Sequence, residues 1–316
     1  MEPTSNWTKI STFLLAGFSS CPLCQKTTFS LFLLVYIFTL LENLSIIALI
    51  VRDNKLWKPM YIFLGNLSFL EVWYISVTLP NVITNIITGN REISYCGCVT
   101  QLFVFTFLGA TECFLLATMA YDRYVAICYP LRYTVIMQDK FVLFLLIVSW
   151  LTGLFTPIVP IWFLTQLNFC GTNEVNHYFC DVSPLLKLAC GNIKPKEIVD
   201  LTVSVFVLIC SMLVIFISYI CITRAILKMP SSTGRYKAFS TCASHLTIVC
   251  VYYGSMSFTY IRVESSSPVS TNKLVSVLYS VITPMLNPII YTLRNKDVRQ
   301  AIQKVCQKPK LSKLGL

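Results

Sequence analysis

Long apolar stretches separated by short clusters of charged residues run along the whole chain. Seven of them are about 20 residues or longer, the length that an α-helix needs to cross a bilayer, and they span approximately residues 27–51, 59–86, 97–121, 141–165, 201–223, 238–261 and 274–293. The strands of an outer-membrane barrel would be about ten residues long and would alternate strictly. The pattern therefore predicts an all-α integral membrane protein, built as a bundle of seven membrane-spanning helices.

The composition agrees with this pattern and excludes a soluble enzyme. Of 316 residues, 55% are hydrophobic and 12% are charged, and the mean hydropathy is +0.69. Soluble chains have about 45–50% apolar and about 25% charged residues. The charged residues are too few to cover the surfaces of two or three soluble domains, so the lipid bilayer is the expected surroundings of the chain.

The positive charge is concentrated on one side of the predicted bundle. The net charge is +11, and most of the 25 Lys and Arg residues lie in alternate loops and after the last span. Because short cytoplasmic loops carry the excess of Lys and Arg, we expect an extracellular tail at residues 1–26, the bundle at 27–293 and a cytoplasmic tail at 294–316 that starts with a short amphipathic helix. A plasma-membrane protein of this orientation explains the charge without a nucleic-acid partner. Asn6 starts an N-glycosylation sequon in the outer tail.

Several cysteines lie on the predicted outer, oxidising side. Cys98 is at the start of the third span, and the long loop between spans four and five contains Cys170, Cys180 and Cys190. We expect the bonds Cys98–Cys180 and Cys170–Cys190, the first of which would hold the loop over the bundle as a lid. Cys96 lies close enough to Cys98 to leave the choice of the span-three cysteine open.

Motifs in several spans point to one family. The third span ends in MAYDRYVAIC at 119–128, followed by YPLRY at 129–133; KPMY stands at 58–61, KAFSTCASHL at 237–246 and PMLNPIIYTLRN at 284–295. Together these motifs closely resemble the signature of vertebrate olfactory receptors of class II, a branch of the rhodopsin-like G-protein-coupled receptors. The resemblance extends over about residues 20–300 in collinear order. One departure is Glu42, where the family usually has Gly.

The resemblance implies an odorant receptor that binds a small, volatile, mostly apolar molecule from outside and activates a stimulatory olfactory-type heterotrimeric G protein, which acts through cyclic AMP. It assigns G-protein coupling and switching to Asp122, Arg123, Tyr124, Tyr219, His245, Asn287, Pro288 and Tyr291. We expect Arg123 to pair with Asp122 in the silent state and to move toward Tyr219 on activation. Pro284 and Pro288 each remove a helix hydrogen bond and predict a hinge near Asn287.

Helical periodicity predicts where a ligand would bind. Phe105, Glu112 and Arg123 lie within about 20° of one stripe of the third span, and that stripe must face the interior because charge facing lipid is costly. Its outer part is uncharged, so we expect an apolar pocket, and the absence of a carboxylate at Phe105 argues against a cationic ligand. The last span lacks the lysine that a retinal protein needs. By resemblance the pocket is lined by Phe105, Thr106, Gly109, Ala110, Val203, Val207, Tyr253, Met256 and Tyr260.

Two carboxyl groups lie inside the predicted membrane. Glu71 is in the second span and Glu112 in the third. Intramembrane acids are expected to be protonated, paired or joined by a cation. The resemblance suggests that this pair holds a sodium ion, and two neutral, hydrogen-bonded acids remain the alternative. No other cofactor is expected.

The sequence does not favour an enzyme. The chain has two histidines, and neither HExxH nor GxSxG occurs. His177 lies in the outer loop, where we expect a structural role in the lid, and His245 lies in the sixth span, where we expect it to support the switch by hydrogen bonding. A multi-pass transporter is the remaining alternative. It predicts inverted repeats with paired broken helices, and the sequence shows no such symmetry.

Overall fold

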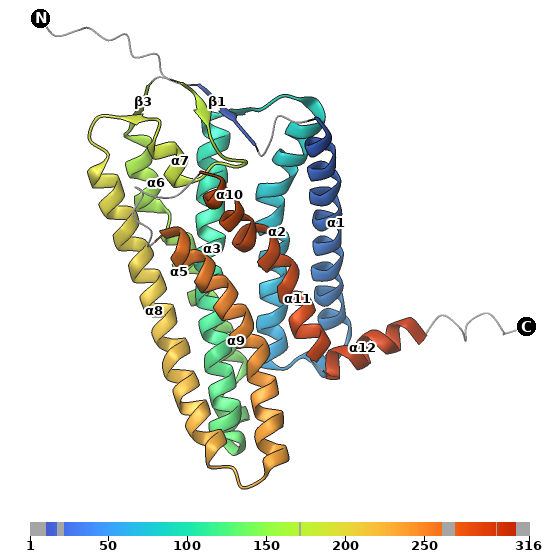
Figure 1. The fold of residues 1–316 in the computed structure, drawn as a ribbon. Coiled ribbons are helices and arrows are strands. Elements are labelled where there is room, and N and C mark those ends of the chain that lie inside the picture. The colour runs from blue at the N-terminus through green and yellow to red at the C-terminus, as the bar shows by residue number, and fades with distance from the viewer. Residues whose placement is uncertain (1–10, 18–21, 171, 261–268, 295, 308–316) are drawn as a thin grey trace, which may run out of the picture.

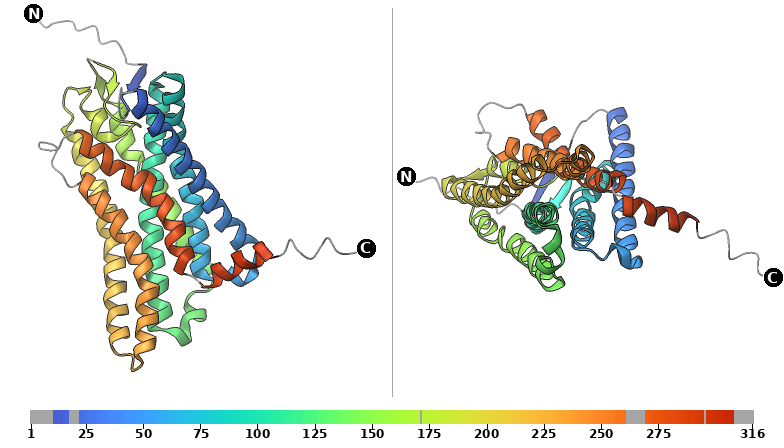
Figure 2. Two further views of the ribbon diagram at one scale, coloured as in Figure 1. Left: turned by 45° about the vertical axis from the view of Figure 1, so that its right-hand side comes forward. Right: turned by 90° about the horizontal axis from the view of Figure 1, so that it is seen from below.

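The computed structural model describes residues 11–17, 22–170, 172–260, 269–294 and 296–307. Long helices lie side by side, short strands cover one end of the bundle, and helix α12 projects sideways at the other (Figure 1, Figure 2). We call these the strand end and the α12 end. Helix α3 is the central helix and packs against α2, α5 and α8.

Long helices occupy all seven predicted positions. They are α1 (Pro22–Arg52), α2 (Pro59–Thr88), α3 (Tyr95–Cys128), α5 (Asp139–Phe155) continued by α6 (Ile158–Thr165), α8 (Lys194–Leu227), α9 (Ser232–Tyr260), and α10 (Val269–Val277) continued by α11 (Thr283–Arg294). Among the described residues, six of these segments are long and apolar enough to cross a membrane. The seventh, α9, is less apolar because Ser, Thr and Tyr make up much of its sequence. The predicted seven-helix bundle is therefore confirmed.

Proline interrupts two of the predicted spans. Pro157 separates α5 from α6, because its ring removes the amide that would continue the helix. In the last span, the five residues Leu278–Ile282 form a π-helical turn between α10 and α11. Pro284 follows this turn and cannot donate to the carbonyl of Ser280. The irregularity thus lies before Asn287, and α11 runs through Pro288 as one helix. The hinge near Asn287 stays a prediction.

Short strands close the strand end of the bundle. Strand β1 (Thr12–Leu15) pairs antiparallel with β2 (Glu92–Ser94) and parallel with β4 (Glu174–Val175), and β3 (Asn168–Phe169) pairs with β5 (Ala189–Cys190). The disulfides Cys98–Cys180 and Cys170–Cys190 hold the same region. Cys96 is a free, exposed cysteine. The chain before α1 is thus hydrogen-bonded to two loops that are distant in sequence.

The α12 end consists of short turns and one terminal helix. Turns of 3₁₀ helix at Asn54–Leu56 and Pro130–Arg132 connect the spans, and α4 (Tyr133–Ile136) lies after α3. Helix α12 (Lys296–Gln307) follows α11 and contacts α1. It buries Val298 and Ala301 and exposes Arg299. This is the amphipathic helix that the sequence predicts after the last span.

Candidate functional site

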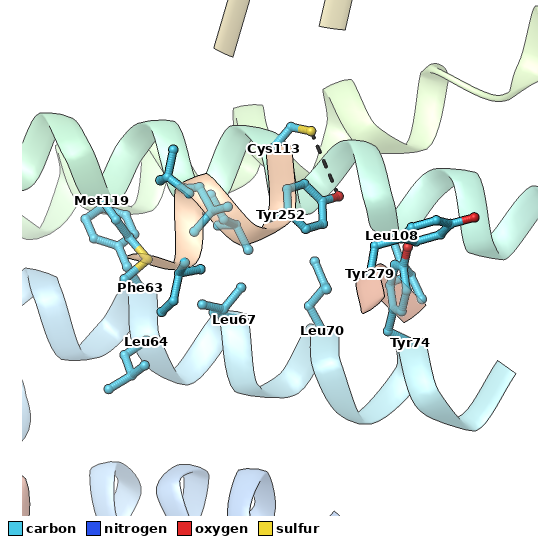
Figure 3. Packing of buried hydrophobic residues seen from close by; sticks show 14 of the residues in the cluster. Phe63, Leu64, Leu67, Leu70, Tyr74, Leu108, Cys113, Met119, Tyr252 and Tyr279 are labelled. Atoms are coloured by element: carbon cyan, nitrogen blue, oxygen red, sulfur yellow. Dashed lines mark hydrogen bonds between the residues drawn. The ribbon is translucent and has the colours of Figure 1, made fainter. Parts of the chain in front are cut away.

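The central helix α3 presents its predicted stripe to the interior of the bundle. Phe105 and Glu112 are buried, as the stripe requires. Tyr252 of α9 crosses to α3, where its hydroxyl donates to the carbonyl of Gly109 at 2.7 Å and lies 4.0 Å from the sulfur of Cys113 (Figure 3). These contacts hold α9 against α3 at the level of Gly109 and Cys113.

A cavity of about 230 Å³ lies beside this stripe, between α3, α6, α8 and α7 (Val182–Leu186) of the long loop. Seven of the nine predicted ligand-binding residues line it: Phe105, Thr106, Gly109, Ala110, Val203, Val207 and Met256. They come from three helices that are far apart in sequence. Helical periodicity and the resemblance thus pointed to seven of the residues that line this cavity, and their contact with a ligand stays a prediction.

Tyr253 and Tyr260 were expected in the same wall. Tyr253 is buried and donates to the carbonyl of Cys113 at 3.2 Å, outside the cavity lining. Its expected ligand contact is corrected, because a hydroxyl in an apolar interior is held by a backbone acceptor instead. The side chain of Tyr260 lies outside the described residues.

One end of the cavity is lined by charged residues that the sequence analysis did not predict. Asp181, Lys196, Glu197 and Asp200 all line it. The ammonium of Lys196 donates to both carboxylate oxygens of Asp200. These residues were overlooked because α8 starts at Lys194 and not near residue 201, so its first turns reach the cavity. The spacing of Lys196 and Asp200, four residues apart, was the available signal. The cavity is therefore apolar over most of its lining, as expected, but carries charged groups at one end that the sequence analysis did not predict.

Asp181 is the loop residue at this charged end. Its Oδ1 accepts from the amide of Val182 at 2.7 Å and caps α7. Burial raises the pKa of Asp181 to about 6; the bond from Val182 opposes the shift, and the nearby charge of Asp200 adds to it. Asp181 is thus a carboxyl group whose charge is costly in the absence of a further partner.

The long loop is tied down over the cavity as a lid. Besides the disulfide to Cys98, His177 lies 2.9 Å from the hydroxyl of Ser276, and the hydroxyl of Tyr178 lies 2.9 Å from that of Ser280. Burial lowers the pKa of His177 to about 3, and the positive charge of Lys273 adds to this shift. His177 is therefore a neutral hydrogen-bonding group.

The two intramembrane acids meet around one amide. Asn287 of α11 donates to Oε1 of Glu71, and its nitrogen lies 3.5 Å from Oε1 of Glu112. Three buried oxygens, Oε2 of both glutamates and Oδ1 of Asn287, have no hydrogen-bond partner among the described residues. Such a set of oxygens fits a hard cation, although the described residues contain no group of three His, Cys, Asp or Glu side chains that could hold a metal ion.

The acid–base pair at the α12 end of α3 is not arranged as expected. Asp122 is buried and accepts from the hydroxyl of Tyr133 at 2.7 Å, whereas Arg123 contacts the sulfur of Met60. Asp122 and Arg123 form no ion pair in the described structure. Their expected direct pairing is corrected, because adjacent residues on a helix point about 100° apart and do not face one another.

A hydrogen-bonded chain crosses three helices above this pair. The hydroxyl of Tyr219 on α8 lies 2.8 Å from Nδ1 of His245 on α9, and Nε2 of the same ring lies 3.1 Å from the carbonyl of Leu116 on α3. A carbonyl only accepts, so Nε2 carries the hydrogen and Nδ1 accepts from Tyr219. Tyr124 donates to the hydroxyl of Tyr129 at 3.4 Å. The side chain of Tyr291 lies outside the described residues.

Comparisons with known proteins agree on one family. The model of the family "Olfactory receptor" matches residues 32–308. Olfactory receptor 6Q1 of Homo sapiens is 50% identical over 96% of this chain and 97% of its own length, and olfactory receptor 6B9 of Mus musculus is 48% identical over 98% of both. Squid rhodopsin shares the fold, with a TM-score of 0.73 over 92% of this chain and 82% of the rhodopsin chain at 15% identity. The chain therefore belongs to the olfactory receptor family, whose members are multi-pass signalling receptors and not enzymes or transporters.

Proposed function

We propose that this receptor binds small, volatile, mostly apolar odorants in the cavity between α3, α6 and α8, and that it activates a stimulatory olfactory-type G protein, which raises cyclic AMP. The observation that carries the proposal is the position of the cavity. It adjoins the central helix and is covered by a loop that a disulfide and two side-chain hydrogen bonds hold in place. A ligand there would contact the helices whose other ends carry the coupling residues.

The proposed orientation puts the strand end outside the cell and the α12 end in the cytoplasm of a plasma-membrane protein. Both disulfides lie at the strand end, and structural disulfides persist in oxidising compartments. The α12 end carries many of the Lys and Arg residues, in agreement with the positive-inside rule. Asn6, which lies before the first described residue, is the proposed glycosylation site on the outer side.

Coupling is proposed to work through the bonds between α3, α8 and α9. In the described conformation, Tyr219, His245 and Leu116 hold these three helices together. Separation of their α12 ends would break both bonds and expose the face around Arg123 to a G protein. Asp122 and Tyr124 lie on the same part of α3, and Asn287, Pro288 and Tyr291 belong to the helix that would shift with them.

Glu71, Glu112 and Asn287 are the residues proposed to hold a sodium ion. The three unsatisfied oxygens support this assignment. A bound cation would supply positive charge that balances two buried carboxylates. The alternative, two protonated acids that share the amide of Asn287, uses the same residues without an ion.

A cyclic-AMP reporter assay with a chemically diverse odorant panel tests the proposed function. Val207→Trp fills the cavity and should abolish responses that the wild type gives. Val205→Trp is the matched control, because Val205 is an exposed residue of the same helix and does not line the cavity. Both variants are compared at equal surface expression. Responses that survive in Val207→Trp would show that odorants bind elsewhere.

A further inference from the structure

The cavity carries an unbalanced negative charge at its lid end. Its lining contains three acids, Asp181, Glu197 and Asp200, and one base, Lys196; no other Lys or Arg and no His belongs to the lining that the structure describes. The acids come from two separate elements, because Asp181 lies in the loop and the other two lie on the first turns of α8.

Lys196 neutralises only Asp200, with which it forms an ion pair, and leaves the charges of Asp181 and Glu197 unbalanced. Its side chain is 1% exposed, and the ammonium donates to both oxygens of Asp200, four residues along the same helix. The charge of Asp200 acts unfavourably on Asp181, and the hydrogen bond that Asp181 receives comes from the neutral amide of Val182. Within the part of the chain that the structure describes, the carboxylates of Asp181 and Glu197 therefore face the lid end of the cavity without an ion-pair partner.

The remainder of the cavity is mostly apolar. Phe105 and Ala110 of α3, Val207 of α8 and Met256 of α9 are among the apolar residues that line it. A ligand that fits both parts has a hydrocarbon body and one positively charged, hydrogen-bond-donating head. This combination gives an apolar contact and a charge-assisted hydrogen bond at the same time.

We propose that the cavity takes aliphatic amines, with the ammonium group at Asp181 and the hydrocarbon chain among the residues of α3, α8 and α9. The inference rests on the proposed function, because it names the ligand class of the same cavity. It revises the sequence-based expectation that the apolar residue Phe105 argues against a cation. The carboxylates come from the lid and from α8 instead of from α3.

An anionic ligand is disfavoured by the same arrangement. A carboxylic acid would face the carboxylates of Asp181, Glu197 and Asp200 at this end, and like charges repel. The ammonium of Lys196 already donates to both oxygens of Asp200, so its charge offsets little of this repulsion. An alcohol can donate one hydrogen bond to Asp181 but supplies no charge, so it should bind more weakly than an amine of equal chain length.

Three ligands of equal chain length test the proposal: octylamine, 1-octanol and octanoic acid. The full-length receptor is assayed in cells by cyclic AMP at measured surface expression, and in purified form by the shift in thermal unfolding temperature. We expect octylamine to be the strongest ligand and octanoic acid to be inactive. Asp181→Asn keeps an oxygen that can accept from Val182 but removes the charge. It should weaken octylamine about tenfold or more and change 1-octanol by less than about threefold. Glu92→Gln, at an exposed acid of β2 outside the cavity, is the control and should change neither.

The outcomes separate this inference from the proposed function. If octylamine neither binds nor activates, or acts equally on Asp181→Asn, the ligand class is wrong. If other odorants still act in that case and Val207→Trp still blocks them, the proposed function stands without it. If octylamine acts and Val207→Trp does not block it, both the cavity assignment and this inference fail.

Discussion

Asn43 of α1 donates its side-chain amide to the backbone carbonyl of Pro284, 3.3 Å away on α11. That carbonyl is the one to which residue 288 would donate in a regular helix, and residue 288 is a proline without an amide hydrogen. Asn43 also donates to the carbonyl of Thr39 in its own helix, at 2.9 Å. A side chain of the first span thus satisfies a backbone group that the proline of the last span leaves without its helical donor.

Asn43→Ala should therefore destabilise the receptor. The carbonyl of Pro284 would lose a buried donor, and a buried unsatisfied polar group costs about 1–3 kcal/mol. The measurement is the thermal unfolding temperature of the purified receptor. Ser45→Ala is the control on the same helix, because Ser45 is exposed and bonds within α1 to the carbonyl of Leu41. Equal unfolding temperatures for Asn43→Ala and Ser45→Ala would contradict the assigned role of Asn43.

Arg123→Ala should abolish G-protein activation at normal surface expression. In the described conformation Arg123 makes no ion pair with Asp122 and contacts Met60, so its charge is available when the α12 end opens. The measurement is ligand-stimulated cyclic AMP normalised to surface receptor. Arg52→Ala, at the end of α1, is the control for the loss of a positive charge at this end of the bundle. Full signalling by Arg123→Ala would refute a role in coupling.

His245→Ala should raise basal signalling. The imidazole connects Tyr219 and Leu116 only while α8, α9 and α3 are close together. Each such hydrogen bond contributes about 0.5–1.5 kcal/mol, so loss of both should shift the balance toward separated helices by about fivefold or more. The measurement is cyclic AMP without ligand at matched surface expression. Thr247→Ala serves as the control, because Thr247 is exposed and bonds within α9.

Much of the fold followed from hydropathy, because a bilayer forces each span into a helix and the seven apolar stretches are separated by charge. The ends of the helices were less predictable. Helix α8 extends outward to Lys194, because Lys196 and Asp200 satisfy each other four residues apart and can continue the helix beyond the apolar stretch. A hydropathy pattern assigns charged residues such as these to a loop. The sequence analysis therefore missed both the start of α8 and the charged end of the cavity.

The side-chain partners within the site were less predictable, because they depend on how separate helices and turns pack against one another. The stripe of Phe105 and Glu112 was correct because burial follows helical periodicity. The partner of Asp122 was wrong, because Tyr133 lies in the short α4 turn after the span and no spacing rule connects the two residues. The assignment of Tyr253 to the pocket failed for a related reason: periodicity gives the face of a helix but not which acceptor a hydroxyl on that face reaches.

Sodium should weaken agonist binding if Glu71 and Glu112 hold the ion in the silent receptor. By linkage, an ion that favours one state lowers the affinity of a ligand that favours the other. The double variant Glu71→Gln and Glu112→Gln keeps the size of both side chains and should lose this dependence. The measurement is agonist affinity as sodium replaces a large organic cation at constant ionic strength. Sodium dependence that persists in the double variant would support two structural, protonated acids.

Acidification should destabilise the receptor through His177. Burial lowers the pKa of His177 to about 3, whereas an unfolded histidine titrates near 6.5. Below about pH 6.5 the unfolded chain binds a proton that the folded chain does not, so the contribution of His177 to stability falls by up to about 1.4 kcal/mol per pH unit. Asp181 has the opposite sign: its pKa is raised to about 6, so the folded chain takes up a proton first and stability at this group rises as the pH falls.

The contribution of His177 is isolated by comparing the wild type with His177→Gln, since Asp181 is present in both. Gln has an amide that can still bond Ser276, the partner of the ring in the lid, but it does not titrate. The difference in unfolding temperature between the two purified receptors should be small at pH 7.5 and should change steadily in favour of His177→Gln between pH 6.5 and pH 5. A difference that is constant over this range would mean that His177 takes up a proton as readily in the folded lid as in the unfolded chain, contrary to its burial.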